Sequence, residues 1–287
     1  MSTLKSQIDS FLAKALDGET TISEDIVEVF GERCKDAIRK QFNASKNEFA
    51  IRMSGIGKPL CQQQLAKQGA DAEIPEPSLK MKLAYGDIVE ALVMAVMEAA
   101  EVNIQSFQDP VEYKLGNINI KGTLDVVVDN KVYDIKSASK YAYDMKFSRP
   151  DGFDKIVKDD PFGYVSQGYL YAAAKDLPFG GWIAFNKETG AIAVTEAPAE
   201  NEYTSVPYKQ RAIQIARKNA EALDLDKPFE RCFNPVVEVV RKKPTPNKTL
   251  HVNCRYCKFK RSCWGDEIVW RKNPRGATHR WYFGEPK

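Results

Sequence analysis

The chain has 287 residues, of which 43% are apolar and 28% are charged, a balance typical of a globular protein with its own hydrophobic core. The formal net charge of +3 is too small to identify a polyanionic partner by itself. The charged, amphipathic N-terminus lacks the apolar region of a signal peptide, and no run approaches the roughly 18 apolar residues of a membrane span. We therefore expect a cytoplasmic chain without membrane contact, in which clustered cysteines bind metal rather than form disulfides.

Helical periodicity dominates the first third of the chain. Apolar residues recur at helical spacing in residues 1–48, which predicts an N-terminal helical segment. Residues 50–75 predict irregular structure with one short helix around Cys61. Residues 79–101 predict a long helix that is apolar around most of its circumference and is therefore buried on several sides.

The middle of the chain changes to the period of strands. Residues 111–137 alternate in this way, whereas residues 140–160, with their prolines and glycines, predict a mobile loop. A helix, a hairpin and an amphipathic helix are expected next, over residues 162–175, 182–197 and 207–224. From Pro228 the sequence predicts a loop-rich segment that ends in a cysteine cluster and a basic, aromatic tail.

The strongest catalytic signal is an acidic hairpin turned at residues 129–130, both of which tolerate positive φ. The register of this hairpin places Asp125 opposite Asp134, with Lys136 on the same face. The other face is apolar and consists of Leu124, Val126, Tyr133 and Ile135. Opposed carboxylates repel unless a cation lies between them, and their oxygens suit Mg²⁺ or Mn²⁺. The alternative is a solvated hairpin face that carries three charges.

The order Gly122-x-x-Asp125 and then Asp134-x-Lys136 resembles the signature of the PD-(D/E)xK nuclease superfamily. The resemblance implies an α/β restriction-endonuclease-like core, with a central mixed β-sheet flanked by the helices over 79–101 and 162–175. It also implies that Asp125 and Asp134 are metal ligands, that Lys136 assists the attacking water, and that the backbone carbonyl of Ile135 is a further ligand.

A glutamate on the long helix fits the same resemblance. RecB-like members carry a histidine four residues after a helix glycine, and here Glu90 stands in that position after Gly86. Exonucleases of the lambda type use a helix glutamate in a comparable role, so Glu90 is a candidate metal ligand, with Asp87 as the weaker choice. The alternative is a narrow exposed stripe that Glu90 shares with Glu98.

Gln167 and Tyr171 lie four residues apart and therefore share one helix face, with Tyr164 beside them. They resemble the Q-x-x-x-Y motif that follows the D-x-K strand in RecB-like nucleases, which implies a place beside the active site and contact with DNA. The amide can hold a carboxylate or a phosphate, and the Tyr171 ring can stack on a base. Tyr169 is expected in the core, and an ordinary aromatic helix is the alternative.

The spacing Cys254-x-x-Cys257-x5-Cys263 is a strong metal signal. With Cys61 ahead of the core, it resembles the iron–sulfur nucleases of the AddB type and their CRISPR-associated relatives. The resemblance implies that these four cysteines bind a structural 4Fe–4S cluster that joins the N- and C-terminal parts of the domain. Zinc is the alternative metal, with His251 as a substitute ligand for Cys61. The two other cysteines, Cys34 and Cys232, are expected to be small buried apolar residues.

Cations and aromatic rings surround the cysteines, in an arrangement that suits single-stranded DNA or a duplex end. They comprise Arg241, Lys242, Lys243, Arg255, Tyr256, Lys258, Phe259, Lys260, Arg261, Trp264, Trp270, Arg271, Lys272, Arg275, Arg280 and Trp281. A solvated charged surface is the alternative.

The predicted organisation is an N-terminal helical segment (1–48), a nuclease core (49–240), and a cysteine cluster with a basic tail (241–287) that Cys61 completes. The predicted function is a metal-dependent DNA exonuclease with a 4Fe–4S cluster, of a stand-alone, phage-like kind that acts in the host cytoplasm. Two alternatives stay open. One is a CRISPR spacer-acquisition nuclease that acts with partners, and the other is a non-catalytic DNA-binding module with a zinc site.

Overall fold

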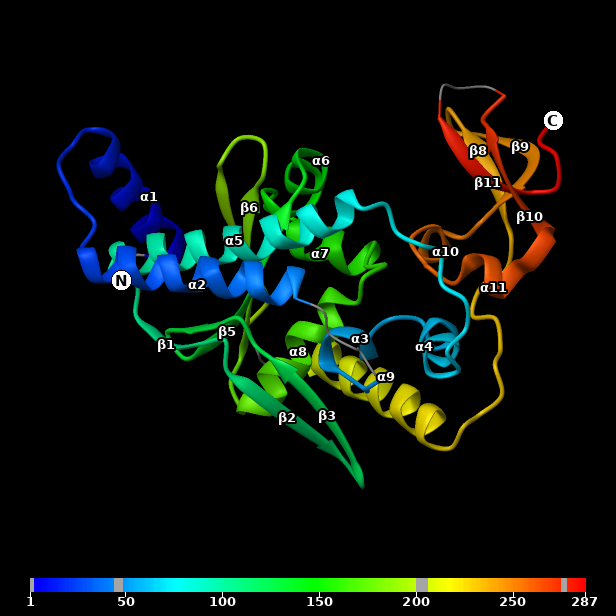
Figure 1. The fold of residues 1–287 in the computed structure, drawn as a ribbon, viewed down its shortest axis with the longest axis horizontal. Coiled ribbons are helices and arrows are strands. Elements are labelled where there is room, and N and C mark those ends of the chain that lie inside the picture. Colours follow the sequence, from blue (N-terminus) through cyan, green and yellow to red (C-terminus); the bar gives the residue numbers. More distant parts are fainter. Residues whose placement is uncertain (1–2, 44–48, 200–205, 275–277) are drawn as a thin grey trace.

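A mixed five-stranded sheet forms the centre of the protein, seen in a computed structural model that describes residues 3–43, 49–199, 206–274 and 278–287 (Figure 1). The strand order is β1-β4-β5-β6-β7, with β5 and β6 parallel and the other neighbours antiparallel. These strands are β1 (Ile104–Phe107), β4 (Val126–Val128), β5 (Lys131–Ala138), β6 (Phe179–Asn186) and β7 (Ile192–Glu196).

Helices cover both faces of this sheet, as the sequence predicts for a mixed α/β core. Those on the first face are α1 (Leu4–Leu16), α2 (Glu24–Phe42) and α5 (Ser78–Ala99). Those of the second face are α3 (Met53–Ile56), α6 (Lys140–Ala142), the π-helical turn η1 (Tyr143–Phe147), α7 (Gly152–Lys158), α8 (Tyr164–Lys175) and α9 (Val206–Asp224).

The apolar circumference of α5 explains its central place. Val89, Met94 and Met97 are buried against one face of the sheet, in the same cluster as Val126 and Ile135. The outer side of α5 is covered by α2, so the helix is enclosed from two directions, as the sequence predicts. Because side chains alternate along a strand, the residues next to these in β4 and β5 lie on the opposite face of the sheet, where they pack against α8 and α9.

The strand-like residues 111–137 do not all belong to one sheet. β2 (Pro110–Leu115) and β3 (Ile118–Thr123) form a separate two-stranded sheet, and the chain enters the central sheet only at β4. At the break, Gln108 N donates to Asp125 O at 2.9 Å, and Leu124 N donates to Asp109 O at 3.0 Å. Leu124 consequently packs in the core cluster opposite the one that holds Val126.

Two predictions of irregular structure are wrong. Residues 140–160 are largely helical rather than a mobile loop, because Tyr143, Phe147, Phe153 and Ile156 point into the core. The segment after Pro228 contains a four-stranded sheet of order β10-β11-β9-β8. Its strands are β8 (Val236–Val240), β9 (Lys243–Thr249), β10 (Ile268–Lys272) and β11 (His279–Phe283).

The cysteine-containing segment lies between β9 and β10 and forms the helices α10 (Val252–Arg255) and α11 (Lys260–Trp264), followed by the 3-10 turn η2 (Gly265–Glu267). The short helix α4 (Leu60–Lys67), which carries Cys61, lies beside them at one end of the molecule (Figure 1). The segment that contains α4 therefore meets the C-terminal segment there, whereas the N-terminus lies at the opposite side of the molecule (Figure 1). In the part of the chain that the structure describes, no helix combines the length and apolarity needed to cross a membrane.

Candidate functional site

The predicted hairpin register is confirmed for the residues that form the ladder. Asp129 and Asn130 have positive φ values of 47° and 59°, and Val126 pairs with Tyr133 across the strands. Asp125 lies one residue before β4, at the break between the two sheets. Its Oδ2 accepts a hydrogen bond from the backbone N–H of Ile135 at 2.7 Å, which fixes the carboxylate beside β5.

Asp134 and Lys136 form an ion pair inside the protein. Asp134 is fully buried, and its Oδ2 lies 2.5 Å from Lys136 Nζ. The other carboxylate oxygen accepts from Gln167 Nε2 at 3.3 Å. The sequence places Asp134 and Lys136 on one face of β5, and the structure turns that face toward α8, where Gln167 is located.

Of the acids on α5 that the sequence singles out, Glu90 is the one directed to this region. Asp87 accepts from Lys40 at 3.0 Å and from Gln41 at 2.6 Å, and Glu98 pairs with Arg33 at 2.7 Å, so both are bound to α2. Glu90 instead accepts from Gln108 Nε2 at the break in the strands. Sequence reasoning missed Gln108, because only the bend at Gln108, with its φ of 51°, brings it to Glu90.

The electrostatics join these groups into one site, which we call the acidic site: Glu90, Asp125, Asp134 and Lys136. Burial raises the pKa of Asp125 well above its usual range, and the charges of Asp134 and Glu90 add to the effect. Burial also raises the pKa of Glu90 to about 7. Burial alone would lower the pKa of Lys136, but the carboxylates of Asp134 and Asp125 outweigh it and raise that pKa.

With all three buried or half-buried carboxylates of the acidic site ionised, one lysine leaves an excess of negative charge, and the raised pKa values of Asp125 and Glu90 reflect the cost of that state. A divalent cation would offset that excess, and carboxylate oxygens are the ligands that Mg²⁺ and Mn²⁺ prefer. The donor chemistry therefore fits such an ion. Within the described ranges, however, no three His, Cys, Asp or Glu side chains surround one point closely enough to hold a metal ion as they stand.

Gln167 and Tyr171 share one face of α8, as predicted, and Gln167 Nε2 lies 3.3 Å from Tyr171 Oη as well as from Asp134. Tyr171 is only 3% exposed, so its ring cannot serve as a stacking platform for a base, contrary to the expectation from the motif. Its neighbour Tyr164 is half-buried and lies beside Lys136. Tyr169 is fully buried, which confirms its predicted place in the core.

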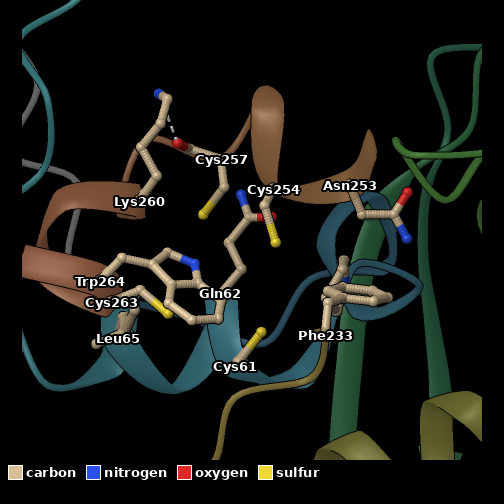
Figure 2. Close-up of a pocket in the computed structure, with 11 residues that line it drawn as sticks. Cys61, Gln62, Leu65, Phe233, Asn253, Cys254, Cys257, Lys260, Cys263 and Trp264 are labelled. Atoms are coloured by element: carbon tan, nitrogen blue, oxygen red, sulfur yellow. Dashed lines mark hydrogen bonds between the residues drawn. The ribbon is translucent and has the colours of Figure 1, made fainter. Parts of the chain in front are cut away.

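The four cysteines of the predicted cluster line one small pocket, which we call the cysteine pocket (Figure 2). Cys61 comes from α4, Cys254 from α10 and Cys263 from α11, with Cys257 between the two C-terminal helices. Figure 2 shows their sulfur atoms around a common space. Among the described residues, no three of these cysteines lie close enough to one point to hold a single metal ion.

The two remaining cysteines are not both buried, which corrects the sequence-based expectation. Cys34 is half-buried and Cys232 is exposed. The backbone N–H of Cys61 donates to Cys232 Sγ at 3.1 Å. The hydrogen bond with the Cys61 thiol lowers the pKa of Cys232 to about 6 and raises the pKa of Cys61. Its isolated sequence position gave no signal of this pairing.

His251 lies outside the residues that line the cysteine pocket. It caps α10, where its Nδ1 accepts from Asn253 N at 3.3 Å, and its ring stacks on Phe233 with ring centres 4.3 Å apart. This arrangement favours Cys61 over His251 as the fourth side chain at the pocket.

The aromatic residues near the cysteines divide into two groups. Phe259 and Trp264 are buried and belong to the core of the segment, whereas Tyr256 and Trp270 are exposed. Arg275 lies outside the residues that the structure describes.

Comparison with known proteins gives little further information. No family model matches the chain, and no curated protein matches it either. Two of the solved structures that resemble the chain do so distantly. SSO0001 has a TM-score of 0.41 and 15% identity, with 80% of this chain and 93% of that chain covered. A protein of Eubacterium rectale named a putative exonuclease has a TM-score of 0.40 and 12% identity, with 74% and 90% covered. Likeness of this degree carries no argument about function.

Proposed function

We propose that this protein is a metal-dependent deoxyribonuclease of the PD-(D/E)xK type that hydrolyses phosphodiester bonds at DNA ends or in single strands. The observation that carries the proposal is the acidic site. Asp125 lies at the break between two sheets and is bound to the backbone of β5, where Lys136 pairs with Asp134. The charges of Asp134 and of Glu90 on α5 both act on Asp125. Residues from three separate segments thus contribute to one charged, largely buried site.

A structural role explains this arrangement less well. Burying three carboxylates with one lysine destabilises a fold unless the charges are compensated. Asp87 and Glu98 on the same helix show how this protein compensates a structural acid, because each has a cationic partner on α2. In the acidic site the pKa values of Asp125 and Glu90 are raised, so their ionised forms are poorly compensated, as is common at functional sites.

In the proposed reaction, bound Mg²⁺ or Mn²⁺ would be held by Glu90, Asp125, Asp134 and the carbonyl of Ile135, and would stabilise the negative charge that develops on the phosphate. Lys136 would orient the attacking water and offset charge on the scissile phosphate. Gln167 holds Asp134 in place through its amide. Tyr171, which lies within reach of Gln167, would support that amide from the core side.

We propose further that Cys61, Cys254, Cys257 and Cys263 hold a structural 4Fe–4S cluster. Four thiols around one pocket supply the complete ligand set of such a cluster. Zinc is the competing assignment, and metal analysis distinguishes the two.

The direct test is digestion of end-labelled single-stranded and blunt duplex DNA with Mg²⁺, Mn²⁺ or EDTA. We expect cleavage that requires the divalent ion, and the pattern of labelled products will distinguish exonuclease from endonuclease action. Absence of cleavage of either substrate by iron-loaded protein at every metal concentration would contradict the proposal.

A further inference from the structure

A row of aromatic side chains leads away from the acidic site. Lys136 Nζ lies 4.9 Å from the centre of the Tyr164 ring. Tyr164 stacks on Phe162, with ring centres 5.5 Å apart and an interplanar angle of 28°. Phe162 in turn lies 5.5 Å from the ring of Tyr256. These three rings, which we call the aromatic row, connect the acidic site to the cysteine-containing segment.

Two of the three rings in the aromatic row are exposed, while Tyr164 is half-buried and packs against the hydrophobic core. Phe162 is 41% exposed and Tyr256 is 67% exposed, whereas Tyr169 on the same helix as Tyr164 is fully buried. Contiguous apolar surface that stays open to solvent marks an interaction site more often than a packing defect. The exposed rings of the aromatic row therefore indicate a binding site for a ligand that stacks on aromatic side chains.

Beyond Tyr256 the surface is both aromatic and cationic. Tyr256, Trp270 and Trp281 line a hollow together with Arg255 and Arg280. The residues that line it include no acid, although Arg280 also pairs with the buried Glu238 at 3.3 Å. Trp270 is 47% exposed and lies 5.3 Å from Trp281. The three rings of the aromatic row thus connect this cationic, aromatic hollow to the acidic site.

We propose that the aromatic row and this hollow bind a single strand of DNA and guide it to the acidic site. Unpaired bases expose both faces to aromatic rings, whereas the bases of a duplex are already stacked on each other. The cations at the hollow would neutralise phosphates of the same strand. This inference rests on the proposed function for the identity of the polymer, and it adds the form of DNA that the site accepts.

Binding can be measured separately from cleavage. Fluorescence anisotropy in EDTA, with labelled oligothymidylates of about 4 to about 16 nucleotides, reports the length of strand that the surface contacts. We expect affinity to rise with length until the strand spans the row. Phe162→Ala and Tyr256→Ala should each weaken binding of the longest oligonucleotide by about 5- to 150-fold, the loss typical of one stacked base.

Three controls make the result specific. Tyr256→Phe keeps the ring and should keep the affinity. Tyr141→Ala removes an equally exposed ring, 74% accessible, from α6, outside the row, and should change nothing. A blunt duplex of the same length should bind equally to all variants. Phe162 is remote in sequence from the cysteines, so its variant tests the row without disturbing the cysteine pocket.

The outcomes separate this inference from the proposed function. Unchanged single-strand affinity in both Phe162→Ala and Tyr256→Ala would overturn the aromatic row, whether or not the protein cleaves DNA. Equal losses of affinity for duplex and single-stranded DNA would also overturn it. The substitutions would then have changed the fold or the surface in general, and not a site that stacks on unpaired bases. A protein that binds through the row but cleaves no DNA would retain this inference and contradict the nuclease proposal.

Discussion

At the scale of single residues, substituting Asp134 or Lys136 alone cannot distinguish a catalytic role of the pair from a structural one. Removing either partner leaves a buried charge uncompensated, which costs about 3–5 kcal/mol of stability and could itself lower activity. We therefore expect Asp134→Asn and Lys136→Met each to lose about 10²- to 10⁴-fold in turnover and to unfold at lower urea concentration.

The double variant Asp134→Asn, Lys136→Met separates catalysis from folding. It removes both charges, so stability should largely return, while cleavage of labelled DNA stays absent. Lys146→Met provides a matched control, because Lys146 is ion-paired and similarly shielded, with 22% of its side chain exposed against 18% for Lys136. Activity that recovers together with stability in the double variant would assign the pair a purely structural role.

Glu90 and Glu98 allow a second comparison on one helix. Glu98 forms a bidentate pair with Arg33, so Glu98→Gln should lower the free energy of unfolding by about 1 kcal/mol and leave cleavage unchanged. Glu90→Gln should leave the free energy of unfolding nearly unchanged and weaken cleavage, because among the described residues Glu90 has no ion pair as close as that of Glu98 and its charge acts on Asp125. We expect the Mn²⁺ concentration for half-maximal cleavage to rise about tenfold or more. Indistinguishable Mn²⁺ titrations for the two variants would remove Glu90 from the site.

At the scale of elements, two glycines test how closely the framework holds the site. A Cβ at Gly122 would lie 2.6 Å from Tyr171 Cε1 and 3.1 Å from Met53, so Gly122→Ala should destabilise the protein by about 1–3 kcal/mol. A Cβ at Gly86 would meet Ser137 Oγ at an ordinary 3.4 Å, and Gly86→Ala within α5 should stabilise by about 0.5–1 kcal/mol. Urea unfolding measures both changes, and equal effects of the two would contradict this packing.

The elements that the sequence predicts correctly are those governed by local periodicity. The helices α5 and α8 and the turn at residues 129–130 depend on neighbouring residues, so their patterns are visible in the sequence. The break at Leu124–Asp125 was not predictable in this way, because it depends on hydrogen bonds from residues 108–109, which are distant in sequence. That break separates Leu124 from Val126 and places Asp125 at a junction of sheets.

The same reasoning applies to the site. The alternation of β5 was enough to place Asp134 and Lys136 together, and helical spacing was enough to place Gln167 beside Tyr171. Tertiary packing decided what each side chain faces, and it buries Tyr171 while leaving Phe162 open to solvent. The spacing of residues in the sequence therefore predicted which side chains lie together, but not which of them are exposed.

At the scale of the whole molecule, the cysteine pocket joins two distant parts of the chain. The segment after α4 is bound to the C-terminal cysteine segment, because Glu73 N donates to Lys258 O at 2.7 Å and the Glu73 carboxylate pairs with Lys260. Cys61 and Cys254 are about 190 residues apart, and linking them through one metal centre removes considerable chain entropy from the unfolded state. The proposed cluster should therefore stabilise the entire fold.

We expect protein purified without oxygen to be brown, with about four irons per chain if the centre is a 4Fe–4S cluster. Cys61→Ser should lose the colour and become prone to aggregation, since it removes both a ligand and the link between the two ends of the chain. Cys34→Ser, at a half-buried position in α2, is the matched control and should keep both colour and stability.

Cys232 makes this test sharper, because its thiol lies on Cys61 and could replace it. The ligand count predicts that Cys232→Ser keeps full iron content and the same visible spectrum as the unsubstituted protein. A colourless protein with one zinc ion would reject iron but retain the four ligands. A brown Cys61→Ser variant with full iron would reject Cys61 as the fourth ligand, and the double variant Cys61→Ser, Cys232→Ser would then show whether Cys232 had taken its place.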